Sequence, residues 1–121
     1  MLIEFIKPDF EFEDERGSLK QLIHMGWKQV NYITSIAGAF RGNHYHKKNT
    51  EAFYVISGTF KLMAETLDKS EKEEYLIKAR DFFTIKPNIN HSFDYTENTQ
   101  LISFYDLGVE NSDGTKDIYV P

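Results

Sequence analysis

Hydrophobic and polar residues alternate in short runs along most of the chain, and residues typical of turns separate these runs. In the run 29–35, Val30, Tyr32 and Thr34 share one face, because successive side chains of a strand point to opposite sides. Ser57-Gly58 predicts a tight hairpin. Strands are predicted at 2–6, 18–25, 29–35, 52–56, 59–67, 82–85, 91–95 and 101–105. Such a series of short strands is typical of an all-β barrel or sandwich.

Length and composition fit one domain, residues 1–121. The ten Phe, seven Tyr and one Trp are bulky enough to fill a small barrel. The net charge of −5 argues against a nucleic-acid or membrane-surface partner. The absence of cysteine excludes disulfides and Cys-ligated metals. No signal peptide is recognisable, and no apolar run reaches the ~20 residues of a membrane span, so a cytoplasmic location is expected.

Three histidines and one glutamate form a candidate metal site. His44 and His46 are two residues apart, so on a strand their imidazoles point to the same face. Glu51 follows shortly after, and His91 comes after a proline-containing turn. Imidazole and carboxylate together suit a divalent ion, with zinc as the default and Fe, Mn or Ni as alternatives. A hydrogen-bonded histidine pair without metal is the other interpretation.

The spacing of these residues resembles the cupin superfamily. The first cupin motif, G-x5-H-x-H-x4-E-x6-G, is filled by Gly38, His44, His46, Glu51 and Gly58. Residues 80–91 follow the second motif and end at His91, although Arg80 and Lys86 replace its usual glycine and first proline. The resemblance implies a single-domain, RmlC-like jelly-roll β-barrel that opens onto the His/Glu cluster.

The segment 70–83 is locally ambiguous. Ser70 and Glu73 fit a helix capping box, and apolar residues follow at helical spacing, so a helix at 71–80 is possible. The register of the second cupin motif favours a charged loop, a strand at 74–77 and a turn at 79–81 instead. We therefore predict the strand.

A narrower resemblance connects the chain with cupins that act on nucleotide sugars. The run Arg41-Gly42-Asn43-His44-Tyr45-His46 is similar to the C-terminal cupin of capsular-polysaccharide reductase/epimerases, which binds zinc. Residues 14–19 resemble the D-x-R-G stretch of dTDP-4-keto-6-deoxyhexose 3,4-ketoisomerases. The dTDP-4-dehydrorhamnose 3,5-epimerases are more distant, because they lack the second histidine. This resemblance implies an isomerase or epimerase of a nucleotide-linked 4-keto-6-deoxy sugar in polysaccharide biosynthesis.

The implied reaction moves a proton next to a ketone. It needs a base, an acid, and positive charge or donors for the enediolate oxygen. His44 or His46 is the expected base, and Tyr32 the proton donor if its face lines the barrel. Arg41 and Asn43 are the expected substrate contacts. A metal on His44, His46, Glu51 and His91 would polarise the ketone.

Several alternatives stay open from the sequence. A histidine bound to metal cannot also act as the base, and the sequence leaves both uses possible. A cupin dioxygenase with a three-His, one-Glu iron site, or a non-catalytic sugar-binding cupin, is also compatible with the motifs. The family resemblance and the exposed sheet edges of a small barrel predict a homodimer.

Overall fold

The computed structural model describes residues 1–121 and contains eleven strands and no helix. The all-β prediction is therefore confirmed. The structure contains no helix with the length and apolar character needed to cross a membrane. The strands are β1 (Ile3–Phe5), β2 (Phe10–Asp14), β3 (Gly17–Gln21), β4 (Gln29–Ser35), β5 (Phe40–His44), β6 (Glu51–Ser57), β7 (Thr59–Thr66), β8 (Lys72–Lys78), β9 (Phe82–Ile85), β10 (Ile89–Tyr95) and β11 (Thr99–Tyr105).

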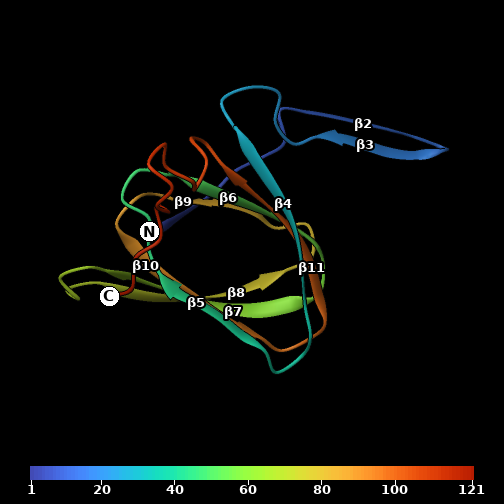
Figure 1. The fold of residues 1–121 in the computed structure, drawn as a ribbon. Coiled ribbons are helices and arrows are strands. Elements are labelled where there is room, and N and C mark those ends of the chain that lie inside the picture. Colours follow the sequence, from blue (N-terminus) through green and yellow to red (C-terminus); the bar gives the residue numbers. More distant parts are fainter.

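Two antiparallel sheets face one another and form the body of the molecule (Figure 1). One sheet has the strand order β1-β9-β6-β11-β4, and the other has the order β5-β10-β7-β8. The core lies between them, because alternate side chains of each strand point inward. Its buried aromatic residues come from both sheets: Phe53 and Phe83 stack at 5.2 Å between ring centroids, and Phe60 and Phe93 at 4.9 Å.

The ambiguous segment is a strand, as predicted from the motif register. All of β8 pairs with β7, from Thr59 opposite Lys78 to Glu65 opposite Lys72. Exposed and partly or fully buried residues alternate along β8, so its side chains follow a period of two. The local helix signal is overridden because β8 completes the second sheet.

The predicted hairpin at Ser57-Gly58 is wrong. Strand β6 pairs with β9 and β11, whereas β7 pairs with β8 and β10, so the chain crosses here from one sheet to the other. Gly58 has φ = 100° and packs against the chain at Asn98 and Thr99. A Cβ at Gly58 would lie 2.5 Å from the Asn98 carbonyl oxygen, so this corner admits only glycine.

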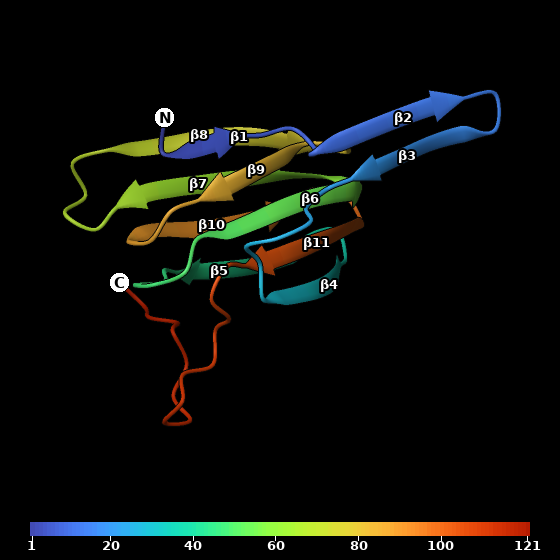
Figure 2. The same cartoon turned by 90° about the horizontal axis from the view of Figure 1, so that it is seen from above.

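A hairpin of β2 and β3 projects from the body of the molecule (Figures 1 and 2). Strand β2 was not predicted, and β3 ends four residues before the end of the predicted strand. Phe10, Phe12 and Leu19 on this hairpin are each about half exposed. The arrangement leaves an apolar surface outside the two main sheets.

The chain after β11 forms an irregular C-terminal segment, residues 108–121. It extends away from both sheets and returns to end beside β5 (Figure 2). There Tyr119 forms an isolated antiparallel bridge with Tyr45. The segment thus reaches the chain that follows β5, close to the histidines.

Candidate active site

The end of β5 and the start of β10 carry the first two histidines. His44 lies opposite His91 in the β5–β10 pairing, and the register shifts immediately afterwards, so that Ser92 faces Gly42. This bulge allows β5 to turn His44 toward the interior. Gly42 has φ = 94°, and a Cβ there would meet the His91 carbonyl oxygen at 2.8 Å. Close contact with β10 therefore requires glycine.

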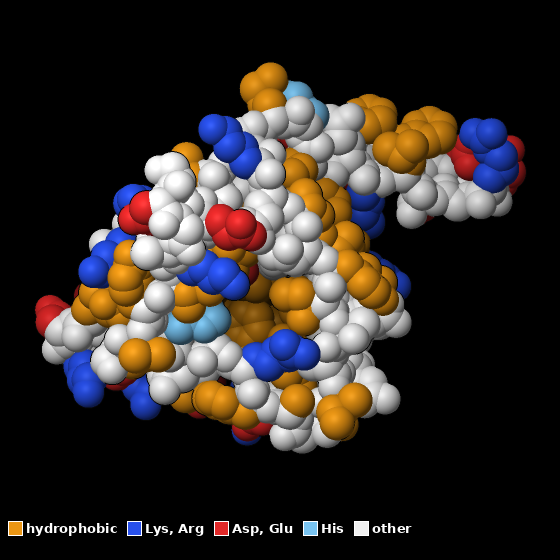
Figure 3. All heavy atoms as spheres, in the orientation of Figure 1, with side chains coloured by type: hydrophobic (Ala, Val, Ile, Leu, Met, Phe, Trp, Pro, Cys, Tyr) orange, Lys and Arg blue, Asp and Glu red, His pale blue; other side chains and the backbone are white.

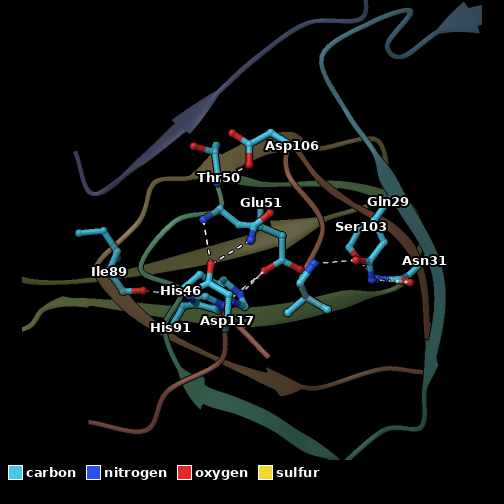
Figure 4. A network of polar contacts seen from close by, with 12 residues as sticks. Gln29, Asn31, His46, Thr50, Glu51, Ile89, His91, Ser103, Asp106 and Asp117 are labelled. Atoms are coloured by element: carbon cyan, nitrogen blue, oxygen red, sulfur yellow. Dashed lines mark hydrogen bonds and ion pairs between the residues drawn. The ribbon is translucent and has the colours of Figure 1, made fainter. Parts of the chain in front are cut away.

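His46 and Glu51 complete the cluster on both sides of the connection to β6. His46 Nε2 lies 3.1 Å from Glu51 Oε1, and His91 Nε2 lies 3.6 Å from the same oxygen. All three residues are nearly inaccessible to solvent. Figure 4 shows how His46, Glu51 and His91 point toward one another between the sheets. The structure thus brings together the four residues of the predicted metal site.

Backbone carbonyls fix the orientation of two imidazole rings. His46 Nδ1 donates to the Asp117 carbonyl at 2.6 Å, and His91 Nδ1 donates to the Ile89 carbonyl at 3.0 Å. A carbonyl oxygen only accepts, so each Nδ1 carries a proton and each ring directs its Nε2 toward the cluster. His91 Nε2 is buried without a hydrogen-bond partner.

The donor set fits a divalent metal ion. Three ring nitrogens, one from each of His44, His46 and His91, lie within 4.8 Å of one another. Rings held at Nδ1 by carbonyls, with Nε2 directed toward the site, are typical of metal-binding histidines. The orphaned His91 Nε2 and the adjacent Glu51 carboxylate would both gain a partner from such an ion.

Burial and neighbouring charge shift the pKa values of His44 and His46 in opposite directions. Burial and the nearby His91 and His46 lower the pKa of His44 to about 4. Burial alone would lower the pKa of His46, but the Glu51 carboxylate and the Asp117 carbonyl outweigh it and raise that pKa. Burial opposes the charge on Glu51, yet the adjacent His46 and His91 imidazoles hold its pKa below the usual value. At pH 7 His44 is therefore neutral and lies near the ionised Glu51 carboxylate.

A pocket of about 290 Å³ opens next to this cluster. Figure 3 shows a hollow lined by hydrophobic side chains, with histidine on one side and Lys or Arg side chains at the rim. Arg41 is anchored at the wall, since its Nε donates to Ser35 Oγ at 2.9 Å and its guanidinium to the Thr34 carbonyl at 3.1 Å. The lining consists of Ile33, Arg41, Gly42, His44, Glu51, Phe53, His91, Phe93, Tyr95 and Tyr105.

Three predicted site residues do not line the pocket. Tyr32 is 63% exposed on the outer face of β4 and bonds to Gln100, because the opposite face of the strand turns inward. Asn43 is exposed at the β5 bulge, where it accepts a hydrogen bond from Asn90. His46 is buried behind Glu51 and meets the pocket only through that carboxylate. These placements correct the expected roles of Tyr32 as proton donor, Asn43 as substrate contact and His46 as base.

The aromatic residues of the pocket were not predicted from the sequence. Tyr95 and Tyr105 line it, together with Phe53 and Phe93 from the core. Burial, followed by the Glu51 charge, raises the pKa of Tyr105 far above its usual value, so its hydroxyl stays protonated. The alternation of β10 and β11 indicates burial of these rings, but no local signal distinguishes the pocket wall from the rest of the core.

The remaining residues of interest lie elsewhere. His24 forms an exposed pair with Asp9 at 2.7 Å. Arg16 is at the tip of the β2–β3 hairpin and pairs with Asp14. Neither residue lines the pocket.

Comparison with known proteins connects this geometry to polysaccharide biosynthesis. The family model described as polysaccharide biosynthesis C-terminal domain matches residues 12–107. A double mutant of the QdtA 3,4-ketoisomerase from Thermoanaerobacterium thermosaccharolyticum, solved in complex with TDP, is 25% identical. It superposes with a TM-score of 0.72 over 87% of this chain and 80% of that chain. These matches confirm the RmlC-like cupin fold and the resemblance to nucleotide-sugar cupins.

Two further relatives are longer than this chain. The capsular polysaccharide assembling protein CapF from Staphylococcus aureus matches with a TM-score of 0.69 at 22% identity, over 92% of this chain and 33% of that protein. The quercetin 2,3-dioxygenase from Aspergillus japonicus is 30% identical over 89 residues, 64% of this chain. The chain spans a quarter of the length of this dioxygenase. CapF supports the fold alone, and the dioxygenase is similar to part of this chain.

Proposed function

The chain belongs to the polysaccharide biosynthesis C-terminal domain family, and from this membership we propose that it isomerises or epimerises a nucleotide-linked 4-keto-6-deoxy sugar. The observation that carries the proposal is the pocket in which neutral His44 faces the same space as Arg41 and Tyr105. The similarity to a 3,4-ketoisomerase solved with TDP supports this substrate class. The proposed product serves the synthesis of a surface polysaccharide.

His44 is the proposed base. A ketone at C4 acidifies the hydrogen at C3, and a neutral imidazole with a free nitrogen takes up that proton. The lowered pKa keeps His44 in the required neutral form. His44 lines the pocket whereas His46 does not, so the structure favours His44 over His46 for this step.

Arg41 and Tyr105 are the proposed donors. Two donor groups of Arg41 hold the side chain to β4, and the guanidinium keeps further N–H groups for an anion. These groups would hold a phosphate or the enediolate oxygen with little reorganisation. The Tyr105 hydroxyl, which stays protonated, would return a proton to the intermediate.

Solvent exchange tests the proposed reaction directly. Incubation with dTDP- or UDP-linked 4-keto-6-deoxyhexoses in D2O is expected to replace the C3 hydrogen by deuterium before net product accumulates, because proton removal precedes every later step. NMR of the C3–H signal measures this, with heat-inactivated protein as the control. If none of the sugars shows enzyme-dependent exchange, the isomerase proposal fails, and a sugar-binding cupin becomes the better interpretation.

The same cluster is a proposed site for a divalent ion, with zinc as the default. His44, His46, His91 and Glu51 would hold it, which satisfies the unpartnered His91 Nε2. When bound, the ion supplies Lewis-acid polarisation of the ketone. An imidazole whose lone pair is used by an ion cannot take up a proton, so ion binding at His44 and base catalysis by His44 exclude one another. Added zinc should therefore slow the exchange if His44 is the base.

A dioxygenase is the second candidate function. The match to quercetin 2,3-dioxygenase and the three-His, one-Glu cluster favour it. Oxygen uptake by iron-loaded protein in the presence of a flavonol, measured with an oxygen electrode, is its test. Uptake without deuterium exchange would favour the dioxygenase, and exchange without uptake would favour the isomerase.

A homodimer is the proposed assembly. Phe10, Phe12 and Leu19 are exposed on the projecting hairpin, and Val30 and Tyr32 are exposed on the outer face of β4. Apolar surface of this kind is a common feature of protein interfaces. Sedimentation velocity is expected to give the mass of two chains, and Phe12→Ser is expected to shift the equilibrium toward the monomer. A monomer throughout the micromolar range would contradict the dimer.

A further inference from the structure

We infer that the C-terminal segment 108–121 is an integral part of the candidate active site, and that Asp117 is a positioning residue that fixes the His46 ring against Glu51. Only the expected effect of Asp117 on the reaction rests on the proposed function. The geometric basis of the inference is independent of that function, because it depends on contacts among His46, Glu51 and Asp117.

The Asp117 carbonyl determines where the His46 ring points. His46 is 3% exposed, and its Nδ1–H donates to this carbonyl at 2.6 Å. The opposite ring nitrogen, Nε2, lies 3.1 Å from Glu51 Oε1, and Glu51 forms part of the pocket wall. A ring rotated away from the carbonyl would lose the Nδ1 partner and withdraw Nε2 from Glu51. Asp117 thus acts on the pocket through His46 and then Glu51.

The Asp117 side chain locks this carbonyl to the loop that carries His46. The side chain is completely buried, and its carboxylate accepts hydrogen bonds from the backbone N–H groups of Lys47, Lys48 and Asn49 at 2.9–3.0 Å. The Asn49 side chain donates to the same carboxylate at 2.9 Å. Four donors around one buried carboxylate strongly restrict both segments, because charge-assisted hydrogen bonds are the stronger ones.

The other side of His46 is held by the same segment. Tyr45 and Tyr119 exchange two backbone hydrogen bonds of 2.9 Å each. The C-terminal segment therefore contacts the residue before His46 through Tyr119 and the residue after it through Asp117. Asp117 and His46 are drawn next to one another in Figure 4, and Glu51 contacts the other nitrogen of the His46 ring.

The C-terminal part of this arrangement lies outside the residues that the family model matches. The match ends at residue 107, ten residues before Asp117. The His46 loop is inside the match, whereas the group that orients its ring is not. The position of His46 in this chain consequently depends on residues that the family motifs do not include.

NMR of the intact protein gives the first test. In 15N-labelled protein, His46 Nδ1 is expected to carry a proton that exchanges slowly with water, because the hydrogen bond to Asp117 is buried. A through-bond correlation between this nitrogen and the Asp117 carbonyl carbon identifies the acceptor. An unprotonated Nδ1, or a proton that exchanges freely, would overturn the inference without any variant being needed.

Variants give the second test. In Asp117→Ala the protection of the His46 Nδ1 proton is expected to fall at least about tenfold, and the C3 exchange rate about ten- to a hundredfold. Asp117→Asn keeps the shape of the side chain and serves if the alanine variant does not fold. Asp113→Asn is the matched control, since Asp113 is an exposed carboxylate of the same segment that accepts only from Thr115.

The outcomes separate this inference from the proposed function. Unchanged His46 protection in a folded Asp117 variant, or an equal effect in Asp113→Asn, would overturn the positioning role. Normal protection in an intact protein that catalyses no exchange would refute the proposed function and leave the positioning role standing.

Discussion

Replacing His44 with asparagine is expected to reduce the rate of deuterium exchange at C3 by about a hundredfold or more, the usual scale for the loss of a general base. Asparagine has no group that takes up a proton near neutral pH. His44 lines the pocket, and burial together with the neighbouring histidines keeps its imidazole neutral.

The pH dependence of the exchange reaction provides a second signature of His44. Its pKa is lowered from 6.5 to about 4, and a base works in its unprotonated form. The rate of the intact enzyme should therefore be insensitive to this group above pH 6 and should fall only as the pH approaches 4. An unperturbed histidine would give a fall centred near pH 6.5. Measurement of kcat/KM from pH 4 to 8 distinguishes the two, since this parameter reports the free enzyme.

His24→Asn is the matched control for His44. His24 is exposed, pairs with Asp9 and lies outside the pocket, so its replacement should leave the exchange rate unchanged. A folded His44→Asn protein with the activity of the intact enzyme would mean that the base is another residue. Equal losses in both variants would indicate a general effect on the fold.

The motif spacing predicted the His/Glu cluster because these residues lie on strand ends that the fold brings together. These residues were identified from the sequence. The structure places nitrogens of the three histidines within 4.8 Å of one another, and Glu51 lies beside His46 and His91. The position of β8 was predicted for the same reason, since the motif fixed the register that local helix propensity obscured. Spacing along a known barrel thus carried more information than local preference.

The orientation of β4 could not be read from its alternation. The pattern separated Val30 and Tyr32 from Asn31 and Ser35, but it did not reveal which set faces inward. Ordinary hydrophobic patterning would bury Val30 and Tyr32, whereas they are 60% and 63% exposed. The inward face carries Asn31, Ile33 and Ser35, of which Ile33 lines the pocket and Ser35 accepts a hydrogen bond from Arg41.

The remaining features were not predicted because they depend on contacts between residues far apart in the sequence. Asp117 and His46 are 71 residues apart, and no periodicity or motif connects them. The corner at Gly58 has the composition of a hairpin, and only the pairing of β6 and β7 with other strands shows that it changes sheets. Tyr105 reaches Glu51 because β11 pairs with β6, where these two residues are directly opposite. Such contacts follow from strand order, which alternation along one strand does not encode.

Replacing Arg41 with glutamine is expected to reduce kcat/KM for C3 exchange by about a hundredfold, the scale for the loss of one preorganised donor to a developing oxyanion. Glutamine keeps an amide donor but loses the charge and the planar fork. Ser35 and Thr34 hold the guanidinium at the pocket wall before substrate binds, so the intact enzyme spends little free energy on orienting it. Arg41→Lys keeps the charge without this anchoring and should recover only part of the rate.

Separate measurement of TDP binding by calorimetry identifies which group Arg41 holds. If Arg41 contacts the diphosphate, the affinity for TDP falls together with kcat/KM in Arg41→Gln. If Arg41 contacts the keto oxygen, TDP affinity is retained and the loss appears in kcat, because that charge develops only in the transition state. Arg80→Gln removes the same charge from an exposed turn outside the pocket and should change neither quantity. Wild-type values of both quantities in Arg41→Gln would show that this arginine only supports β4, and that the substrate anion is held by a different part of the pocket.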